Sequence, residues 1–187
     1  MLRAARAAPD RVAAHLERSA KMKHLIDRLS VCAENPECGT TSFRLSLLLG
    51  DTKRNIPIQV SEYFSSCIPA VTLKLEHHRI LSPHHILEEN QELIPGCYCV
   101  SYGLPVIATD DSGDAISIDI ESGRVYLLSH DKFESDGLQR GWNEAMTDFL
   151  PVLPFTRENI IQTAEEEWDS IEDFLESLIQ VYDQKKY

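Results

Sequence analysis

The segment "VIATDDSGDAISIDIESGRVYLLSHD" (106–131) constrains the fold more than any other part of this 187-residue chain. It contains three short apolar runs, separated by turns rich in Asp, Ser and Gly, which tolerate turn backbone and bond to it. In the middle run Ile116, Ile118 and Ile120 alternate with polar residues, which is the period of a strand with one buried face. Because strands joined by short turns pair antiparallel, the segment predicts an antiparallel meander in the C-terminal half.

The segments around the meander have the patterns of helices that could cover a sheet. Apolar side chains in residues 171–182 recur at steps of three and four, which indicates an amphipathic helix, and Ser170 stands at its capping position. Further elements are predicted as helices at 10–29, 82–90 and 156–167, and as one strand at 71–80. Two segments fit a strand or a helix: 42–50 and 56–69. We expect five residues to be buried together: Ile116, Ile118, Val125, Phe174 and Leu175.

The sequence therefore predicts the α+β class, with a mainly antiparallel sheet flanked by helices. We expect this domain to span residues 42–187, after a basic N-terminal helix and loop over 1–41. The net charge is −12, but residues 1–30 carry seven Lys or Arg and three Asp or Glu, a local +4, so the remainder carries −16. An acidic body of this kind repels nucleic-acid phosphates and favours encounter with cationic partners.

The apolar runs and the cysteines indicate in which cellular compartment the protein is located. No stretch approaches the roughly eighteen apolar residues that a membrane-spanning helix needs. The five cysteines are odd in number and lack the spacing of a disulfide framework, which favours a reducing compartment. We therefore expect a cytoplasmic protein that neither enters a membrane nor binds nucleic acid.

The carboxylates and the His and Cys residues were considered as metal or catalytic sites. A calcium loop beginning at Asp110 would require Gly at its sixth position, where the chain has Ala115. The acidic residues are better interpreted as ends of hairpins. His77 and His78 would point to opposite sides of a strand, and Cys97-x-Cys99 is not the usual zinc spacing. We expect no metal, no cofactor and no enzymatic activity; a metal-dependent enzyme using the His and Cys residues is the least favoured alternative.

Residues 104–131 resemble the signature region of the SUKH superfamily, which includes yeast cell-wall synthesis regulators and many bacterial toxin-immunity proteins. The corresponding positions are Thr109, Asp110, Gly113, Asp114, Gly123, Val125, Tyr126, His130 and Asp131. The segment 165–179 is similar to the closing helix of that family. Upstream, "IPIQVSEYF" (56–64) and "RILSPHHILEEN" (79–90) are similar to family elements, but "SSC" (65–67) stands where the family has Asn-Gly-Gly, and 132–164 is longer. The resemblance implies an α+β fold whose sheet and loops dock a ligand without catalytic residues.

Charge and resemblance together predict an immunity-type protein that binds and neutralises a cationic, nuclease-like toxin. The alternative is an intracellular regulatory or scaffold module of the same fold without a toxin partner. The residues expected to contact the partner are four turn carboxylates and two aromatic anchors: Asp110, Asp111, Asp114, Glu121, Tyr126 and Trp142. A carboxylate in a turn can attract a cationic enzyme while it remains solvated.

Overall fold

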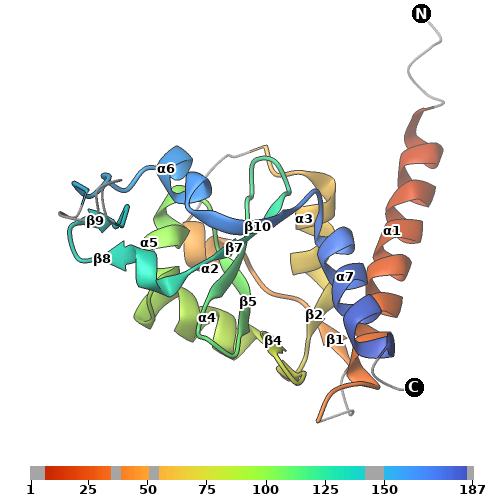
Figure 1. Cartoon of the computed structure of the whole chain (residues 1–187). Helices are drawn as coiled ribbons and strands as arrows, with labels where there is room; N and C mark the ends of the chain where they lie inside the picture. The colour runs from red at the N-terminus through yellow and green to blue at the C-terminus, as the bar shows by residue number, and fades with distance from the viewer. Residues whose placement is uncertain (1–6, 35–38, 51–54, 142–149, 185–187) are drawn as a thin grey trace, which may run out of the picture.

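A six-stranded antiparallel sheet forms the centre of the molecule in the computed structural model (Figure 1). The structure describes residues 7–34, 39–50, 55–141 and 150–184. The strand order is β10-β7-β6-β5-β4-β3, and every pair is antiparallel. The strands are β3 (Leu73–Lys74), β4 (His78–Ile80), β5 (Val106–Asp110), β6 (Ala115–Ile118), β7 (Val125–Leu128) and β10 (Ala164–Trp168). The predicted α+β class and the antiparallel meander β5-β6-β7 are confirmed.

Helices and two small strand pairs surround the sheet. The α-helices are α1 (Ala7–Ser30), α2 (Ser46–Leu49), α3 (Ile58–Glu62), α4 (Pro83–Glu92), α5 (Gly96–Cys99), α6 (Arg157–Gln162) and α7 (Ile171–Gln184). A π-helical turn, Tyr63–Cys67, continues α3. The strand pairs are β1 (Thr40–Thr41) with β2 (Ile68–Pro69), and β8 (Phe133–Glu134) with β9 (Gly137–Leu138). In the described ranges, no helix combines the length and apolar character required to cross a membrane.

Apolar clusters lie on both faces of the sheet, because alternate residues of a strand point to opposite sides. Val125 belongs to the larger cluster, whereas Tyr126 and Leu128 belong to the smaller one. The larger cluster is completed by α1, α3, α4 and α7, and the smaller one by α5, α6 and the β8–β9 pair. The five residues predicted to share a core are all fully buried in the larger cluster.

Helix α7 is anchored at its start and along its apolar face. The Ser170 hydroxyl accepts a hydrogen bond from the backbone N–H of Asp173 at 3.1 Å and donates one to the Asp173 carboxylate at 2.7 Å. This arrangement satisfies an otherwise unpaired N–H of the first helical turn. One turn further, the Phe174 ring contacts Trp168 of β10 edge-on, with centroids 5.1 Å apart. The contact joins the predicted final helix to the edge of the sheet.

Helix α1 lies beside α7, and its first turns extend beyond the body of the molecule (Figure 1). Its C-terminal half contributes four side chains to the larger cluster: Met22, Leu25, Ile26 and Leu29. Two exposed ion pairs follow the contact between the helices, Lys21 with Glu176 at 2.8 Å and Arg28 with Asp183 at 2.5 Å. The division of the chain at residue 41 stays a prediction, but the helix that precedes it packs in the same core as the sheet.

Two predicted elements differ from the structure. Residues 71–80 form the β3–β4 hairpin rather than one strand, because the chain turns between Leu75 and His78, whose backbones are hydrogen bonded at 2.8 Å. The helix capped by Thr156 ends at Gln162 instead of about Glu167, and the next residues form β10. Both undecided segments contain helix: α2 lies within 42–50, and α3 with the π-helical turn makes up most of 56–69, before β2.

Candidate binding surface

Three connections meet at one end of the sheet and bring five carboxylates together. They are the β3–β4 turn, the β5–β6 turn and the chain that follows β7. These connections meet because of the strand register, in which His78 pairs with Asp110 and Ala115 pairs with Leu128. We call this region the acidic end and define it by Glu76, Asp110, Asp111, Asp114 and Asp131. It contains three of the four carboxylates that were predicted to contact a partner.

Those three carboxylates have different roles. Asp110 closes its own turn, since one of its oxygens accepts hydrogen bonds from the backbone N–H groups of Ser112 and Asp114, both at 2.9 Å. Asp111 is exposed and accepts from His77 Nδ1 at 3.0 Å. Asp114 is buried and accepts from both the backbone N–H and the ring of His130. The expectation that all three carboxylates project freely into solvent is therefore wrong for Asp114.

Two histidines flank the β5–β6 turn, and each faces two carboxylates. His77 lies 3.0 Å from Asp111 through Nδ1 and 3.3 Å from Glu76 through Nε2. His130 lies 2.7 Å from Asp114 through Nδ1 and 3.1 Å from Asp131 through Nε2. The hydrogen bond to Asp114 is the main cause that raises the pKa of His130, and burial opposes it only in part. A third histidine, His78, follows His77 in the chain and begins β4. It is half-buried, and burial lowers its pKa.

The other residues predicted to contact a partner are not part of the acidic end. Glu121 lies in the β6–β7 turn, at the opposite end of β6, and is 3.9 Å from Arg157. Tyr126 is buried in the smaller cluster, and burial is the main cause that raises its pKa. Trp142 lies outside the described residues. The structure therefore does not bring the six predicted residues into one surface.

Asp119 ends a strand as predicted but is fully buried. Its carboxylate accepts from the backbone N–H of Glu121 at 3.0 Å and from the Ser122 hydroxyl at 2.5 Å. It also forms an ion pair with the guanidinium of Arg157, from α6. The pair fastens the β6–β7 turn to α6, so Asp119 has a structural role.

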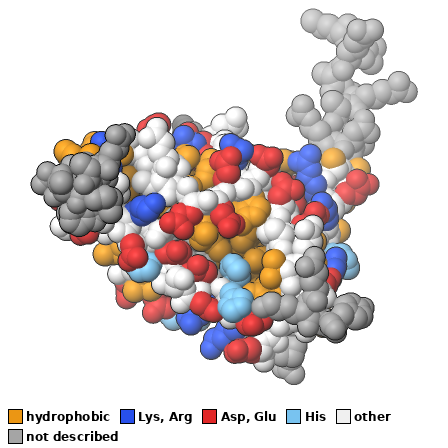
Figure 2. Space-filling view, in the orientation of Figure 1, with side chains coloured by type: hydrophobic (Ala, Val, Ile, Leu, Met, Phe, Trp, Pro, Cys, Tyr) orange, Lys and Arg blue, Asp and Glu red, His pale blue; other side chains and the backbone are white. Residues whose placement is uncertain are grey.

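An apolar area lies next to the acidic end on the face of the sheet that carries α7. Figure 2 shows apolar side chains near the middle of this face, with acidic side chains around them and histidines beside them. The register aligns Ile116 of β6, Leu127 of β7 and Glu166 of β10 across this face. Leu127 and Trp168 are only partly buried there, and Val181 of α7 is 46% exposed. Sequence reasoning missed Leu127, because strand alternation alone does not show which buried face is left partly open.

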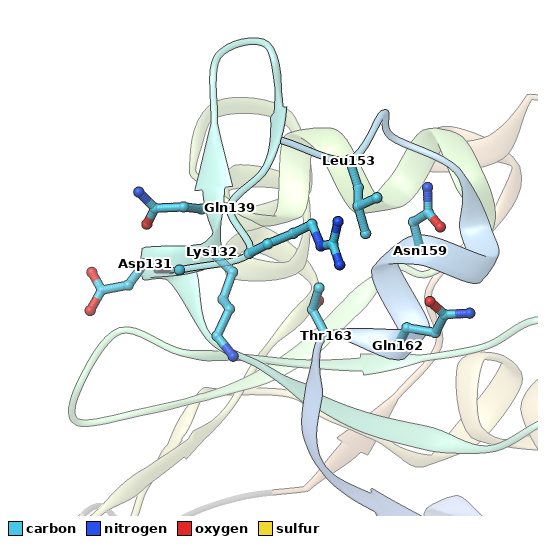
Figure 3. Close-up of a pocket in the computed structure, with 9 residues that line it drawn as sticks. Asp131, Lys132, Gln139, Leu153, Asn159, Gln162 and Thr163 are labelled. Carbon is cyan, nitrogen blue, oxygen red and sulfur yellow. The ribbon is translucent and has the colours of Figure 1, made fainter. Parts of the chain in front are cut away.

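A cavity of about 650 Å³ lies between α6 and the β8–β9 pair (Figure 3). Several polar groups that line it bond to the chain itself. The Asn159 amide donates to the carbonyl of Pro154, the Thr163 hydroxyl donates to that of Ile160, and the Lys132 ammonium lies 3.7 Å from Glu165. The labelled Asp131 carboxylate points away from Asn159 and Thr163 in Figure 3. The cavity is thus a depression whose polar side chains do not converge on one point.

The His and Cys residues that the structure describes do not form a metal-binding cluster. Cys97 and Cys99 lie on α5 and not on the extended segment expected from the sequence. Burial raises the pKa of the Cys99 thiol. Among the side chains described, no three His, Cys, Asp or Glu residues are arranged to hold a metal ion.

Comparisons with known proteins found no relative of this chain: no protein-family model matches it, and neither does any curated protein or solved structure.

Proposed function

We propose that this chain is a non-enzymatic binding protein of the immunity type, which neutralises a cationic, nuclease-like toxin in the cytoplasm. The resemblance of residues 104–131 to the SUKH superfamily supports this proposal, since many members of that superfamily bind secreted toxins. A nuclease that holds phosphate groups must be cationic at its active site, and an acidic binding surface would be attracted to it.

The observation that carries the proposal is the position of the acidic end beside the partly open apolar area. Interfaces combine an apolar centre, which supplies most of the affinity, with a polar rim, which governs association rate and specificity. The apolar centre of such an interface would consist of Leu127, Trp168 and Val181. Its charged rim would consist of Asp111, Asp131 and Glu166. Leu127 replaces Tyr126 as the anchor in this proposal, because Tyr126 packs on the opposite face.

The first experiment asks whether a toxin exists. The gene adjacent to this one should encode a toxin, and co-expression of this chain should restore the growth of cells that produce it. An adjacent gene without toxic activity, and a chain that protects against no toxin encoded nearby, would favour the regulatory or scaffold module of the same fold.

The second experiment locates the binding surface by reversing exposed charges. The double variant Asp111→Lys/Glu166→Lys spares Asp110 and Asp114, which hold the backbone and His130. We expect it to bind the catalytically inactivated toxin several-fold more slowly at low salt, with the difference shrinking as salt screens the charges. Surface plasmon resonance at several salt concentrations would measure the association rate.

A matched control separates the local surface from net charge. Glu88→Lys/Glu92→Lys on α4 changes the charge by the same amount, at exposed positions on another element. It should bind nearly as fast as the original protein. Equal slowing by both double variants would show that only the net charge matters, and the acidic end would then be the wrong surface.

A further inference from the structure

His130 is placed where its protonation state decides how many carboxylates its ring can pair with. It lies two residues beyond the last residue of β7, and its backbone N–H and Nδ1 both approach one oxygen of Asp114, at 2.9 and 2.7 Å. On the other side of the ring, Nε2 lies 3.1 Å from Asp131. An ionised carboxylate can only accept hydrogen bonds, whereas a neutral imidazole has one N–H and one lone pair. The Nδ1 hydrogen bond to Asp114 and the ion pair of Nε2 with Asp131 therefore exist together only when the imidazole is protonated.

Loss of the proton would release Asp131 rather than Asp114. Asp114 is buried and is also held by the backbone N–H of His130, which does not titrate. The Asp131 side chain is 84% exposed and can turn into solvent. The neutral state thus keeps the bond to Asp114 and leaves the Asp131 carboxylate available to another cation.

The charged groups around His130 are carboxylates on two sides. Asp110 and Asp114 face it from the β5–β6 turn, and Asp131 lies in its own turn. The neighbouring Lys132 is directed toward Glu165 of β10, at 3.7 Å. The hydrogen bond to Asp114 contributes most to the raised pKa of His130, and the charges of Asp131 and Asp110 add to it. The proton is therefore lost at a higher pH than from an ordinary histidine, whose pKa is about 6.5.

We infer that the acidic end is a proton-gated surface for the Lys and Arg side chains of a protein partner, with His130 as the gate. This inference rests on the proposed function, because it names how the same surface is regulated. Protonated His130 forms an ion pair with Asp131, and its positive charge lowers the net negative charge of the acidic end by one. Neutral His130 frees that carboxylate, so a cationic partner associates faster at higher pH.

The first test needs no partner. The ring protons of His130 should titrate by NMR above about 6.5 in the original protein. The midpoint should fall in Asp114→Asn, which removes the charged acceptor. A midpoint at or below 6.5, or no change in Asp114→Asn, would overturn the inference even if the protein binds a toxin.

The second test measures association with the inactivated toxin at low salt, at pH 5.5 and pH 8. We expect the original protein to associate about threefold faster at pH 8. His130→Gln, which is never charged, should reduce this pH dependence and stay fast, whereas His130→Arg should stay slow. His84→Gln, an exposed histidine on α4, is the control and should keep the dependence.

The outcomes separate the two proposals. The same pH dependence in His130→Gln as in the original protein would overturn the gate while leaving toxin binding intact. A chain that binds no cationic toxin would overturn the proposed function, and the NMR titration would still decide whether His130 is held by both carboxylates at low pH.

Discussion

Asp119 stands in a turn between two strands and yet has no exposed side-chain surface. Sequence reasoning placed it with the other acidic hairpin ends, since Asp is common in turns for the way it bonds nearby backbone. That part is correct, because its carboxylate accepts the backbone N–H of Glu121. Its burial could not be predicted, because the partner Arg157 is 38 residues away, on a helix whose position depends on the whole fold.

Removal of the Asp119 carboxylate should strongly destabilise the protein. The Arg157 side chain, which is only 26% exposed in the original protein, loses its closest partner in Asp119→Ala. The β6–β7 turn also loses the carboxylate that accepts hydrogen bonds from Glu121 and Ser122. We expect a loss of about 3 kcal/mol in the free energy of unfolding, near the lower end of the range for a broken buried pair. Urea unfolding would measure it.

Glu121→Ala is the control for that substitution. Glu121 is exposed and lies 3.9 Å from the same Arg157, so its removal should change stability by less than about 0.5 kcal/mol. Similar losses in both variants would contradict the structural role assigned to Asp119.

At the scale of elements, α7 depends on the contact of Phe174 with Trp168 and the larger cluster. Phe174→Ala should cost about 3–5 kcal/mol, because it leaves a cavity where a fully buried ring was. Val181→Ala, on the exposed side of the same helix, should cost little. Urea or thermal unfolding would compare the two, and a loss under about 1 kcal/mol for Phe174→Ala would contradict the docking of α7.

The elements predicted from the sequence are those with a regular apolar period. β6 and α7 were found because Ile116 and Ile118, and Phe174 and Leu178, repeat at the spacing of their element. β10 was missed because Glu165, Glu166 and Glu167 give it no alternation and favour helix by composition. Its pairing with β7 comes from the tertiary fold, which overrides local preference.

At the scale of the molecule, the N-terminal helix is divided between core and solvent. Ile26 is fully buried in the larger cluster, whereas Leu16, in the first half of α1, is 63% exposed. Ile26→Ala should therefore cost about 2–5 kcal/mol, and Leu16→Ala should change stability by less than about 0.5 kcal/mol. Denaturant unfolding of both variants would test this.

The outcome also bears on the division of the chain at residue 41. If α1 were a separate arm, the two substitutions would have equally small effects. The sequence correctly predicted a helix over residues 10–29, and the apolar residues of its second half pack in the larger cluster.

The order of the strands has a consequence for how other chains can approach. The two outer strands are β3, of only two residues, and β10, which carries three consecutive glutamates. An open edge normally invites another strand to pair with it and is a common origin of aggregation, and short or charged edges suppress this. A long β-strand from a partner would meet either too few backbone groups or a row of carboxylates. We therefore expect the protein to remain dispersed at high concentration and its partners to dock through side chains rather than by extending the sheet.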